Sequence, residues 1–211
     1  MRPSLDSATL YGIIDLGYVL PEDFVIRAQQ LVAGGIDLLQ LRAKGCDLGD
    51  IEQWCLELLP LCREAKIPFI VNDYPEIAKK VGSDGVHIGQ EDGSLEQTRS
   101  IVGEQMIVGR STHSLEQAQT ALAEGFDYIG FGPLYPTPTK KGRPAIGLDE
   151  VSLAEKAVGT QIPMFCIGGV KVENLEEVMT AGARRVVVVS GLLTAIDPIA
   201  EVKAAKAKLS S

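Results

Sequence analysis

Strand-sized apolar runs alternate with helical patterns along the chain, and this alternation limits the fold more than any other feature. Most of the runs are short and almost continuously apolar, as expected for strands that are covered on both faces. Eight strands are predicted, over residues Thr9–Ile14, Asp37–Arg42, Pro68–Asn72, Gly85–Ile88, Met106–Arg110, Asp127–Phe131, Pro163–Ile167 and Arg185–Ser190. This order of elements favours a sheet of parallel strands joined by helices.

The helices are predicted from apolar spacing and from the residues at their ends. The clearest apolar face is made by Ile51, Trp54, Cys55, Leu58, Leu59 and Cys62. Asp47 is expected to cap the first turn of that helix. Ser114 with Gln117 is typical of a capping box, and Asp197 followed by Pro198 is typical of the start of the last helix.

A glycine recurs where a predicted helix ends and the next strand begins. Three joints are similar, at Ala33–Leu38, Ala123–Tyr128 and Thr180–Arg185, with a variant at Val81–Val86. Glycine suits a left-handed helix C-cap, and a unit repeated every ~20–50 residues is typical of repeated architectures. We therefore expect a (β/α)8 TIM barrel, formed as a single domain over residues 1–211. An open doubly wound sheet is the alternative, but no dinucleotide GxGxxG follows the first strand.

Composition excludes several classes of function. The chain has 211 residues, with 20 Lys and Arg against 28 Asp and Glu, so its net charge of −8 argues against a nucleic-acid surface. No apolar run approaches the ~20 residues that span a bilayer, and residues 1–6 lack the apolar segment of a secretory signal. The four cysteines form no CxxC pair and are expected to be buried thiols. We expect a cytoplasmic protein that binds neither nucleic acid nor membrane.

Two carboxylates follow adjacent predicted strands, at the end where TIM barrels carry their chemistry. Asp73 follows the third strand and Asp92 follows the fourth. Because neighbouring strands lie ~4.8 Å apart, the two side chains can meet over the rim. A carboxylate pair without His or Cys companions suits Mg²⁺, which keeps waters and shares phosphate oxygens. The alternative, favoured when the two residues are considered alone, is a pair of helix caps or solvated side chains.

Cations and glycines occupy other positions on the same rim. Arg42 and Lys44 lie just beyond the second strand and can both point inward at an anion, or else form a salt-bridged surface pair. Gly168 and Gly169 follow the seventh strand, where TIM barrels often bind phosphate, although a plain tight turn is the alternative.

The long segment after the sixth strand, residues 132–144, combines prolines with hydroxyl and basic side chains. Loops of this length in compact domains are usually functional, so we interpret it as a closing, anion-binding flap. The two histidines, His87 and His113, are interpreted as structural, with His87 a buried ring bonded to a neighbour. A hydrolytic triad has little support, because no Ser or Cys accompanies them in a suitable arrangement.

Taken in order, these rim segments resemble thiamine phosphate synthase. The order, together with GxHxGQED-like and PTxTK-like segments, is highly specific and covers nearly the whole chain. The segments are Gln40–Lys44, Asn72–Asp73, Asp84–Asp92, Ser111–Ser114, Gly130–Pro133, Pro136–Lys140, Gly168–Gly169 and Val189–Ser190. That family joins hydroxymethylpyrimidine diphosphate to hydroxyethylthiazole phosphate, releasing diphosphate and forming thiamine phosphate.

The resemblance implies a role for each matching residue. Asp73 and Asp92 would hold Mg²⁺ on the diphosphate, and Gln40 and Ser111 would face the pyrimidine. The implied diphosphate ligands are Arg42, Lys44, Asn72 and Lys140. The implied ligands of the thiazole phosphate are Thr137, Thr139, Gly169, Val189 and Ser190. Catalytic roles are implied for Arg42, Lys44, Ser111 and Lys140, and the partners would be small phosphorylated molecules, with a homo-oligomer left open.

Some positions depart from the family pattern. Ala43 stands where the family usually has an acidic residue, which is expected to remove only a secondary contact. Arg110 replaces a small aliphatic residue and is expected to add a cation near the pyrimidine, and Gly191 replaces Ala. Two alternatives remain: the related thiazole tautomerase, which usually lacks the complete metal and diphosphate set, and a non-catalytic barrel that binds thiazole phosphate.

Overall fold

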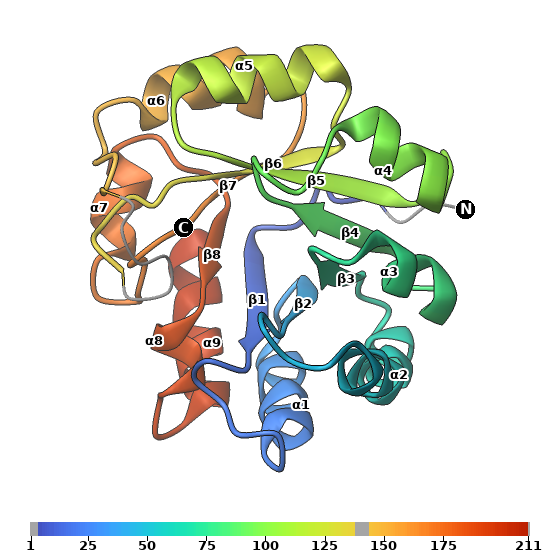
Figure 1. Cartoon of the computed structure of the whole chain (residues 1–211). Helices are drawn as coiled ribbons and strands as arrows, with labels where there is room; N and C mark the ends of the chain where they lie inside the picture. The colour runs from blue at the N-terminus through green and yellow to red at the C-terminus, as the bar shows by residue number, and fades with distance from the viewer. Residues whose placement is uncertain (1–3, 138–143, 211) are drawn as a thin grey trace.

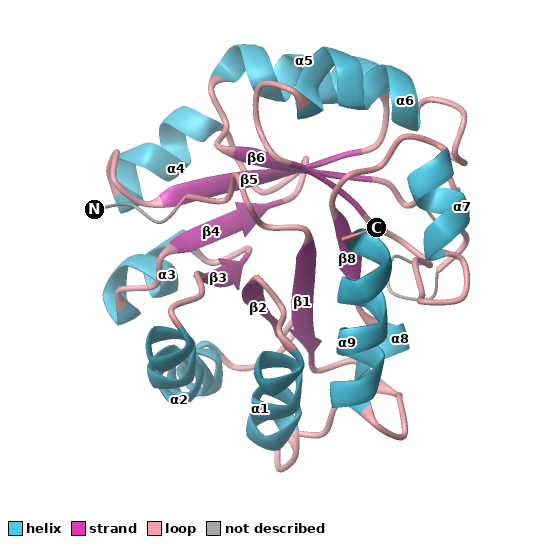
Figure 2. Ribbon diagram, turned by 180° about the vertical axis from the view of Figure 1, so that it is seen from behind, coloured by secondary structure: helices cyan, strands magenta, loops and turns pink. Residues whose placement is uncertain are grey.

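Eight parallel strands form a closed barrel in the order β1 to β8, and helices surround it (Figures 1 and 2). The computed structural model describes residues 4–137 and 144–210. The strands are β1 Leu10–Asp15, β2 Leu38–Arg42, β3 Phe69–Asn72, β4 Gly85–Ile88, β5 Ile107–Thr112, β6 Tyr128–Phe131, β7 Met164–Cys166 and β8 Val186–Val188. β1 pairs with β8 as well as with β2, which closes the barrel and confirms the predicted TIM-barrel fold.

Most helices lie between successive strands, and the last two follow β8. They are α1 Phe24–Gly34, α2 Leu48–Ala65, α3 Pro75–Val81, α4 Leu95–Val102, α5 Leu115–Glu124, α6 Val151–Ala154, α7 Leu175–Thr180, α8 Ser190–Leu193 and α9 Pro198–Leu209. A π-helical turn at Glu155–Gly159 extends α6. The last predicted strand was too long at its end, because Ser190 already begins α8.

Most of the predicted helix ends are confirmed. The Asp47 side chain accepts a hydrogen bond from the backbone N–H of Gly49, and Asp197 accepts one from Ala200. Left-handed glycines follow α1, α3 and α5, as the repeated joint predicts. The capping box at α5 is only half formed. The Ser114 hydroxyl accepts from the Gln117 N–H, but the Gln117 side chain accepts from the N–H of His113.

The strands separate two apolar cores, because successive side chains point to opposite faces. The larger core lies between the barrel wall and the helices, and contains the buried thiols of Cys55, Cys62 and Cys166. The smaller core fills the barrel, with Leu5 and Ala8 from the N-terminal segment added to residues from the strands. Its members from the strands are Tyr11, Ile13, Leu38, Ile70, Ile107, Tyr128, Phe165 and Val187. The barrel interior is therefore packed with side chains below the rim.

No helix among residues 4–137 and 144–210 is both long enough and apolar enough to cross a membrane.

Candidate active site

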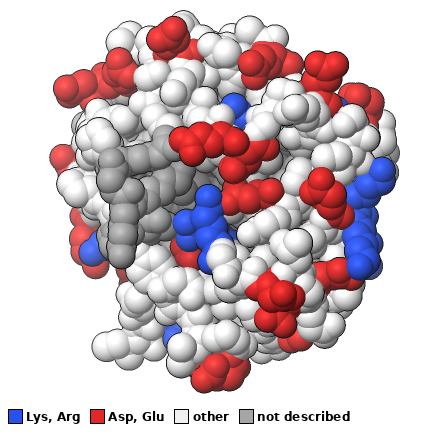
Figure 3. Space-filling model, viewed as in Figure 1, with Lys and Arg blue, Asp and Glu red and all other residues white. Residues whose placement is uncertain are grey.

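The C-terminal ends of the strands surround a cavity of about 320 Å³. Its lining comes from all eight strands or the residues that follow them, so segments far apart in sequence meet at this mouth. Figure 3 shows basic atoms gathered near the centre of one face, with acidic atoms beside them. Eight of the predicted site residues line the cavity: Gln40, Arg42, Lys44, Asn72, Asp73, Asp92, Ser111 and Val189.

A smaller hollow of about 40 Å³ adjoins the cavity and shares part of its apolar lining. Both are lined by Ile167, Val187 and Val189. The remaining predicted residues that the structure describes, Thr137, Gly169 and Ser190, line this second hollow. Thr139 and Lys140 lie outside the described residues. The described members of the predicted set thus line two adjoining hollows.

The two predicted metal ligands come together at the rim. Asp73 has a φ of 67°, a left-handed conformation that Asp tolerates better than most residues. Burial raises the pKa of the Asp73 carboxyl; the Lys44 ammonium, 2.9 Å away, opposes this rise, and the nearby Asp92 carboxylate adds to it. Asp92 itself accepts a hydrogen bond of 2.7 Å from the Gly89 N–H. Among the described residues, the two carboxylates therefore lie close to each other, and the Lys44 ammonium lies beside Asp73.

Arg42 is oriented by an acidic residue that the sequence analysis did not consider. Its Nη1 lies 2.8 Å from Oδ2 of Asp15, whose side chain is 2% exposed. Asp15 also accepts a hydrogen bond from the Gly17 N–H. Because Asp15 ends β1, applying the strand-end rule to the first strand would have found it. Arg42 is thus a paired cation at the cavity wall, and the other N–H groups of its guanidinium are available for an anion.

Asn72 supplies a buried donor that lacks a protein partner within the described part of the chain. Its Nδ2 is inaccessible to solvent and makes no hydrogen bond there. An unsatisfied buried amide costs about 1–3 kcal/mol, so native proteins usually retain one for a reason. Asn72 lines the same cavity as Arg42 and Lys44. Arg42, Lys44 and Asn72, from two neighbouring strand ends, therefore line one cavity.

The donor set at the rim fits a hard divalent cation. Asp73 and Asp92 offer carboxylate oxygens, which Mg²⁺ prefers, and crowding between them is relieved by a positive charge. No group of three or more His, Cys, Asp and Glu side chains suited to a metal is found among the described residues. A cation here would complete its shell with water and phosphate oxygens, as Mg²⁺ commonly does.

Below the rim, a chain of hydrogen bonds crosses the barrel. Gln40 Nε2 donates to the Tyr11 hydroxyl at 2.6 Å, and the Tyr11 and Tyr128 hydroxyls lie 3.1 Å apart. His87 Nδ1 lies 3.0 Å from the Tyr128 hydroxyl, and its Nε2 lies 2.9 Å from Ser111 Oγ. The expectation of a buried, bonded His87 is confirmed. The tyrosines were missed, although both occupy inward-facing positions of predicted strands.

Arg110 does not lie where the sequence analysis placed it. It is absent from the cavity lining, because neighbouring Ser111 points inward and the strand alternation turns Arg110 outward. Its Nη1 donates to the Gly93 carbonyl at 2.7 Å, and its Nη2 to the Gln90 carbonyl at 3.3 Å. The guanidinium also lies 5.4 Å from the centre of the Phe126 ring. Arg110 therefore anchors the loop that carries Asp92, and is no added cation beside a substrate.

Comparison with known proteins adds independent information. A family model described as thiamine monophosphate synthase matches residues 10–192. The thiamine-phosphate synthase of Thermus thermophilus is 43% identical over 183 residues, 87% of each protein. That of Acidothermus cellulolyticus is 42% identical over 199 residues, 94% of this chain and 93% of the relative.

Solved structures agree with the sequence comparison. A thiamine phosphate pyrophosphorylase from Pyrococcus furiosus is 30% identical, with a TM-score of 0.87 over 97% of this chain and 96% of that one. A 3-hexulose-6-phosphate synthase matches with a TM-score of 0.68 over 95% of this chain and 99% of that one. At 19% identity this second likeness concerns the fold alone.

Proposed function

This chain belongs to the thiamine monophosphate synthase family and is a transferase that forms thiamine phosphate. From that premise, we propose how the residues around its cavity carry out the coupling. The substrates are hydroxymethylpyrimidine diphosphate and hydroxyethylthiazole phosphate. The diphosphate lies in the larger cavity, and the thiazole phosphate enters the smaller hollow beside it.

The observation that carries this proposal is the convergence of donors on one wall of the cavity. Arg42, Lys44 and Asn72 all line it, and the buried Nδ2 of Asn72 has no hydrogen-bond partner among the described residues. Together they match a polyanion of several oxygens, and the charges of Arg42 and Lys44 neutralise the negative charge that grows on diphosphate as it leaves. Lys140, from the neighbouring undescribed segment, is proposed as a further donor on sequence grounds.

Asp73 and Asp92 would hold Mg²⁺ at the edge of this wall. When bound, the ion supplies charge neutralisation for the diphosphate oxygens. Lys44, which is paired with Asp73 in this structure, would direct its ammonium toward the diphosphate when Asp73 and Asp92 hold the cation. Asp15 keeps Arg42 in place throughout, because the ion pair between them is nearly buried.

The remaining residues bind and orient the organic parts. Gln40 and Ser111 hold the pyrimidine above Tyr11 and Tyr128, which lie below the rim. The bond between the methylene carbon and the diphosphate oxygen breaks, diphosphate leaves with the electron pair, and the ring stabilises the cationic methylene. The thiazole nitrogen then donates its lone pair to that carbon, so no protein nucleophile is needed.

The phosphate of the thiazole is assigned to the smaller hollow. Gly169 offers backbone there, and Ser190 begins α8 on the opposite side. Thr137 and Val189 complete the described wall, and Thr139 is proposed as an additional ligand on sequence grounds. Residues 138–143 of the segment 132–144, which the sequence predicts to be a closing flap, lie outside the described residues.

We also propose that the enzyme works in the cytoplasm. Its four cysteines are all free thiols, which suits a reducing compartment. Burial raises the pKa of Cys55, Cys62 and Cys166 to about 12, so these thiols are unreactive packing groups.

The test is a coupling assay with both phosphorylated precursors. Purified protein with Mg²⁺ should release thiamine phosphate and diphosphate in equal amounts, and chelation of the metal should stop the reaction. Tautomerisation of a thiazole carboxylate phosphate without coupling would assign the chain to the related tautomerase activity. Binding of thiazole phosphate without any turnover would indicate a non-catalytic barrel.

A further inference from the structure

The hydrogen bonds beneath the cavity form one continuous chain across five residues. It begins at Gln40 on β2, passes through Tyr11 on β1, Tyr128 on β6 and His87 on β4, and ends at Ser111 on β5. All five side chains are buried to at least nine-tenths, and all line the cavity. Both ends of the chain are groups that would face the pyrimidine.

A buried hydroxyl must use its single proton in a hydrogen bond, so the direction of one link sets the direction of the next. Nε2 of Gln40 is a donor, so the Tyr11 oxygen accepts from it and the Tyr11 proton goes to Tyr128. Tyr128 then donates to Nδ1 of His87, which must be unprotonated. The ring proton of neutral His87 is left on Nε2, where it donates to Ser111.

Burial keeps both phenols in their neutral, proton-donating form. It raises the pKa of Tyr11 and raises that of Tyr128 well above its ordinary value. The aromatic rings are also held in place, since Tyr11 and Tyr128 both pack edge-on against Phe165, with ring centres 5.3 and 5.9 Å apart. Neither phenol has an alternative side-chain partner among the described contacts that would interrupt the chain.

We propose that Tyr11 is a positioning residue that couples the hydrogen-bonding patterns of Gln40 and Ser111. In this arrangement Gln40 presents its Oε1 acceptor to the cavity, while Ser111 directs its hydroxyl proton away from His87. The hydrogen-bond directions of Gln40 and Ser111 are therefore linked. If the Gln40 amide turned over, each hydrogen bond through the tyrosines and the imidazole would reverse, and so would that of Ser111.

The consequence for substrate choice rests on the proposed function. An aminopyrimidine offers an amino donor and unprotonated ring nitrogens, which match an amide oxygen and a serine hydroxyl. A 4-oxo analogue places a carbonyl oxygen where the amino group would be, facing the Oε1 acceptor. A site with fixed polar groups rejects such a mismatch strongly, so the chain favours amino over oxo substrates.

The chain direction can be measured without any substrate. Nitrogen-15 NMR of tag-free, ¹⁵N-histidine-labelled protein at pH 8 distinguishes the two neutral tautomers of imidazole. The chain contains two histidines, so the H113Q variant identifies the His87 signals. We expect the Nε2–H tautomer of His87 to predominate. The Nδ1–H tautomer would overturn the proposal, whatever the outcome of the coupling assay.

The role of Tyr11 is tested by Tyr11→Phe, which keeps the ring and removes only the hydroxyl. The His87 signals should then report a mixture of tautomers, because Tyr128 can donate or accept. The ratio of kcat/KM for the 4-amino diphosphate to that for its 4-oxo analogue should be at least about 100 in the parent protein and about tenfold lower in the variant. A folded variant with a parental tautomer and an unchanged ratio would show that Tyr11 only packs the barrel.

Discussion

Individual residues at the rim are held by pairings that leave part of each group available for ligand. Asp15 occupies one side of the Arg42 fork, and Gly89 donates its N–H to one oxygen of Asp92. Asp73 carries a left-handed backbone that brings its carboxylate beside Lys44 and Asp92. Such conformations cost of order 1 kcal/mol and cluster at functional sites. The rim is therefore organised before a ligand arrives.

Asp92→Asn should reduce Mg²⁺-dependent coupling by about 100-fold, because the metal loses a charged ligand while the diphosphate keeps its own charge. Thiazole phosphate binding should change little, since Asp92 does not line the smaller hollow. Initial rates over a Mg²⁺ series and calorimetric binding would measure both effects. Glu96→Gln is the matched control, because it removes the charge of an exposed carboxylate in the first turn of α4. Equal rates for the two variants would contradict the metal assignment.

Loops after the strands are joined to the elements beneath them by specific side chains. The loop between β4 and α4 carries Asp92, and Arg110 on β5 binds two of its carbonyls from outside the barrel. Gln90 in the same loop donates back to the Ser111 carbonyl. An arginine fork is well suited to holding two carbonyls at once, whereas a lysine supplies a point charge. The loop is thus positioned by its neighbouring strand.

Arg110→Leu should loosen this loop without altering the cavity lining. We expect faster amide hydrogen exchange at residues 89–93 in the metal-free protein, and a several-fold higher Mg²⁺ concentration for half-maximal rate. Arg110→Lys should lie between Leu and the parent, because it keeps the charge but not the fork. Parental exchange rates in the Leu variant would refute the anchoring role.

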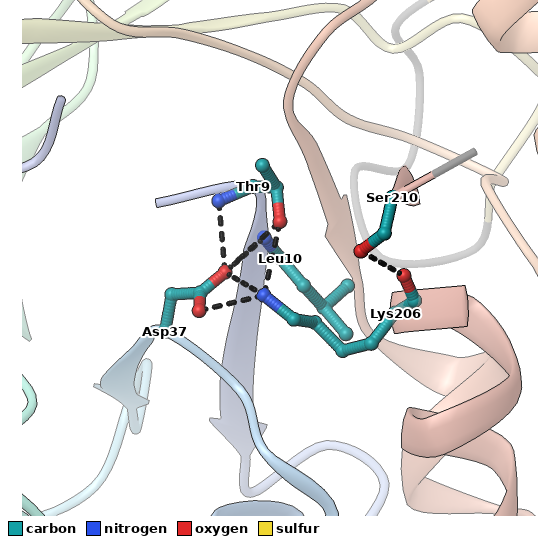
Figure 4. Close-up of polar contacts among 5 residues, drawn as sticks. All are labelled: Thr9, Leu10, Asp37, Lys206 and Ser210. Carbon is teal, nitrogen blue, oxygen red and sulfur yellow. Dashed lines mark hydrogen bonds and ion pairs between the residues drawn. The ribbon is translucent and has the colours of Figure 1, made fainter. Parts of the chain in front are cut away.

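At the scale of the whole molecule, the barrel is fastened at the end opposite the cavity. Lys206 on α9 lies 2.7 Å from Asp37, which precedes β2, and the same carboxylate accepts from the backbone N–H groups of Thr9 and Leu10 (Figure 4). Ser210 then hydrogen-bonds the Lys206 carbonyl. One carboxylate therefore joins the start of β1, the start of β2 and the last helix. We propose that residues 1–211 unfold as one domain for this reason.

Asp37→Asn should lower the free energy of unfolding by about 1–3 kcal/mol at pH 7. Burial alone would raise the pKa of Asp37, but Lys206 and the backbone donors outweigh it and the pKa is lowered from 3.8. A lowered pKa stabilises the fold above the unfolded-state value, and this stabilisation disappears as the pH falls through the folded-state value. The difference between variant and parent should therefore shrink below about pH 4.

Urea unfolding of both proteins between pH 7 and pH 3 would measure this difference. Lys206→Met removes the partner cation, and the double variant should lose less than the sum of the single losses. A single transition by fluorescence and circular dichroism is expected throughout. A difference that stays constant with pH would contradict the ionic origin, and separate transitions would contradict the one-domain proposal.

Sequence alone determined the fold and most of the rim. Strand and helix periodicities are local properties, and parallel strands joined by helices must all end on the same side. That rule was enough to predict that one cavity is lined by Gln40, Arg42, Asp73, Asp92 and Ser111. Asp15 was missed because the rule was not applied to the first predicted strand, which ends at the residue before it.

Tertiary structure decided everything that depends on pairing across the barrel. Register and barrel closure set the distances between residues that are far apart in the chain. They decide which acid orients Arg42, which way Arg110 points, and how Tyr11 connects to His87. Asp37 and Lys206 are 169 positions apart, and no local pattern relates them. Their contact exists because the last helix packs against α1 and β1 once the barrel has closed.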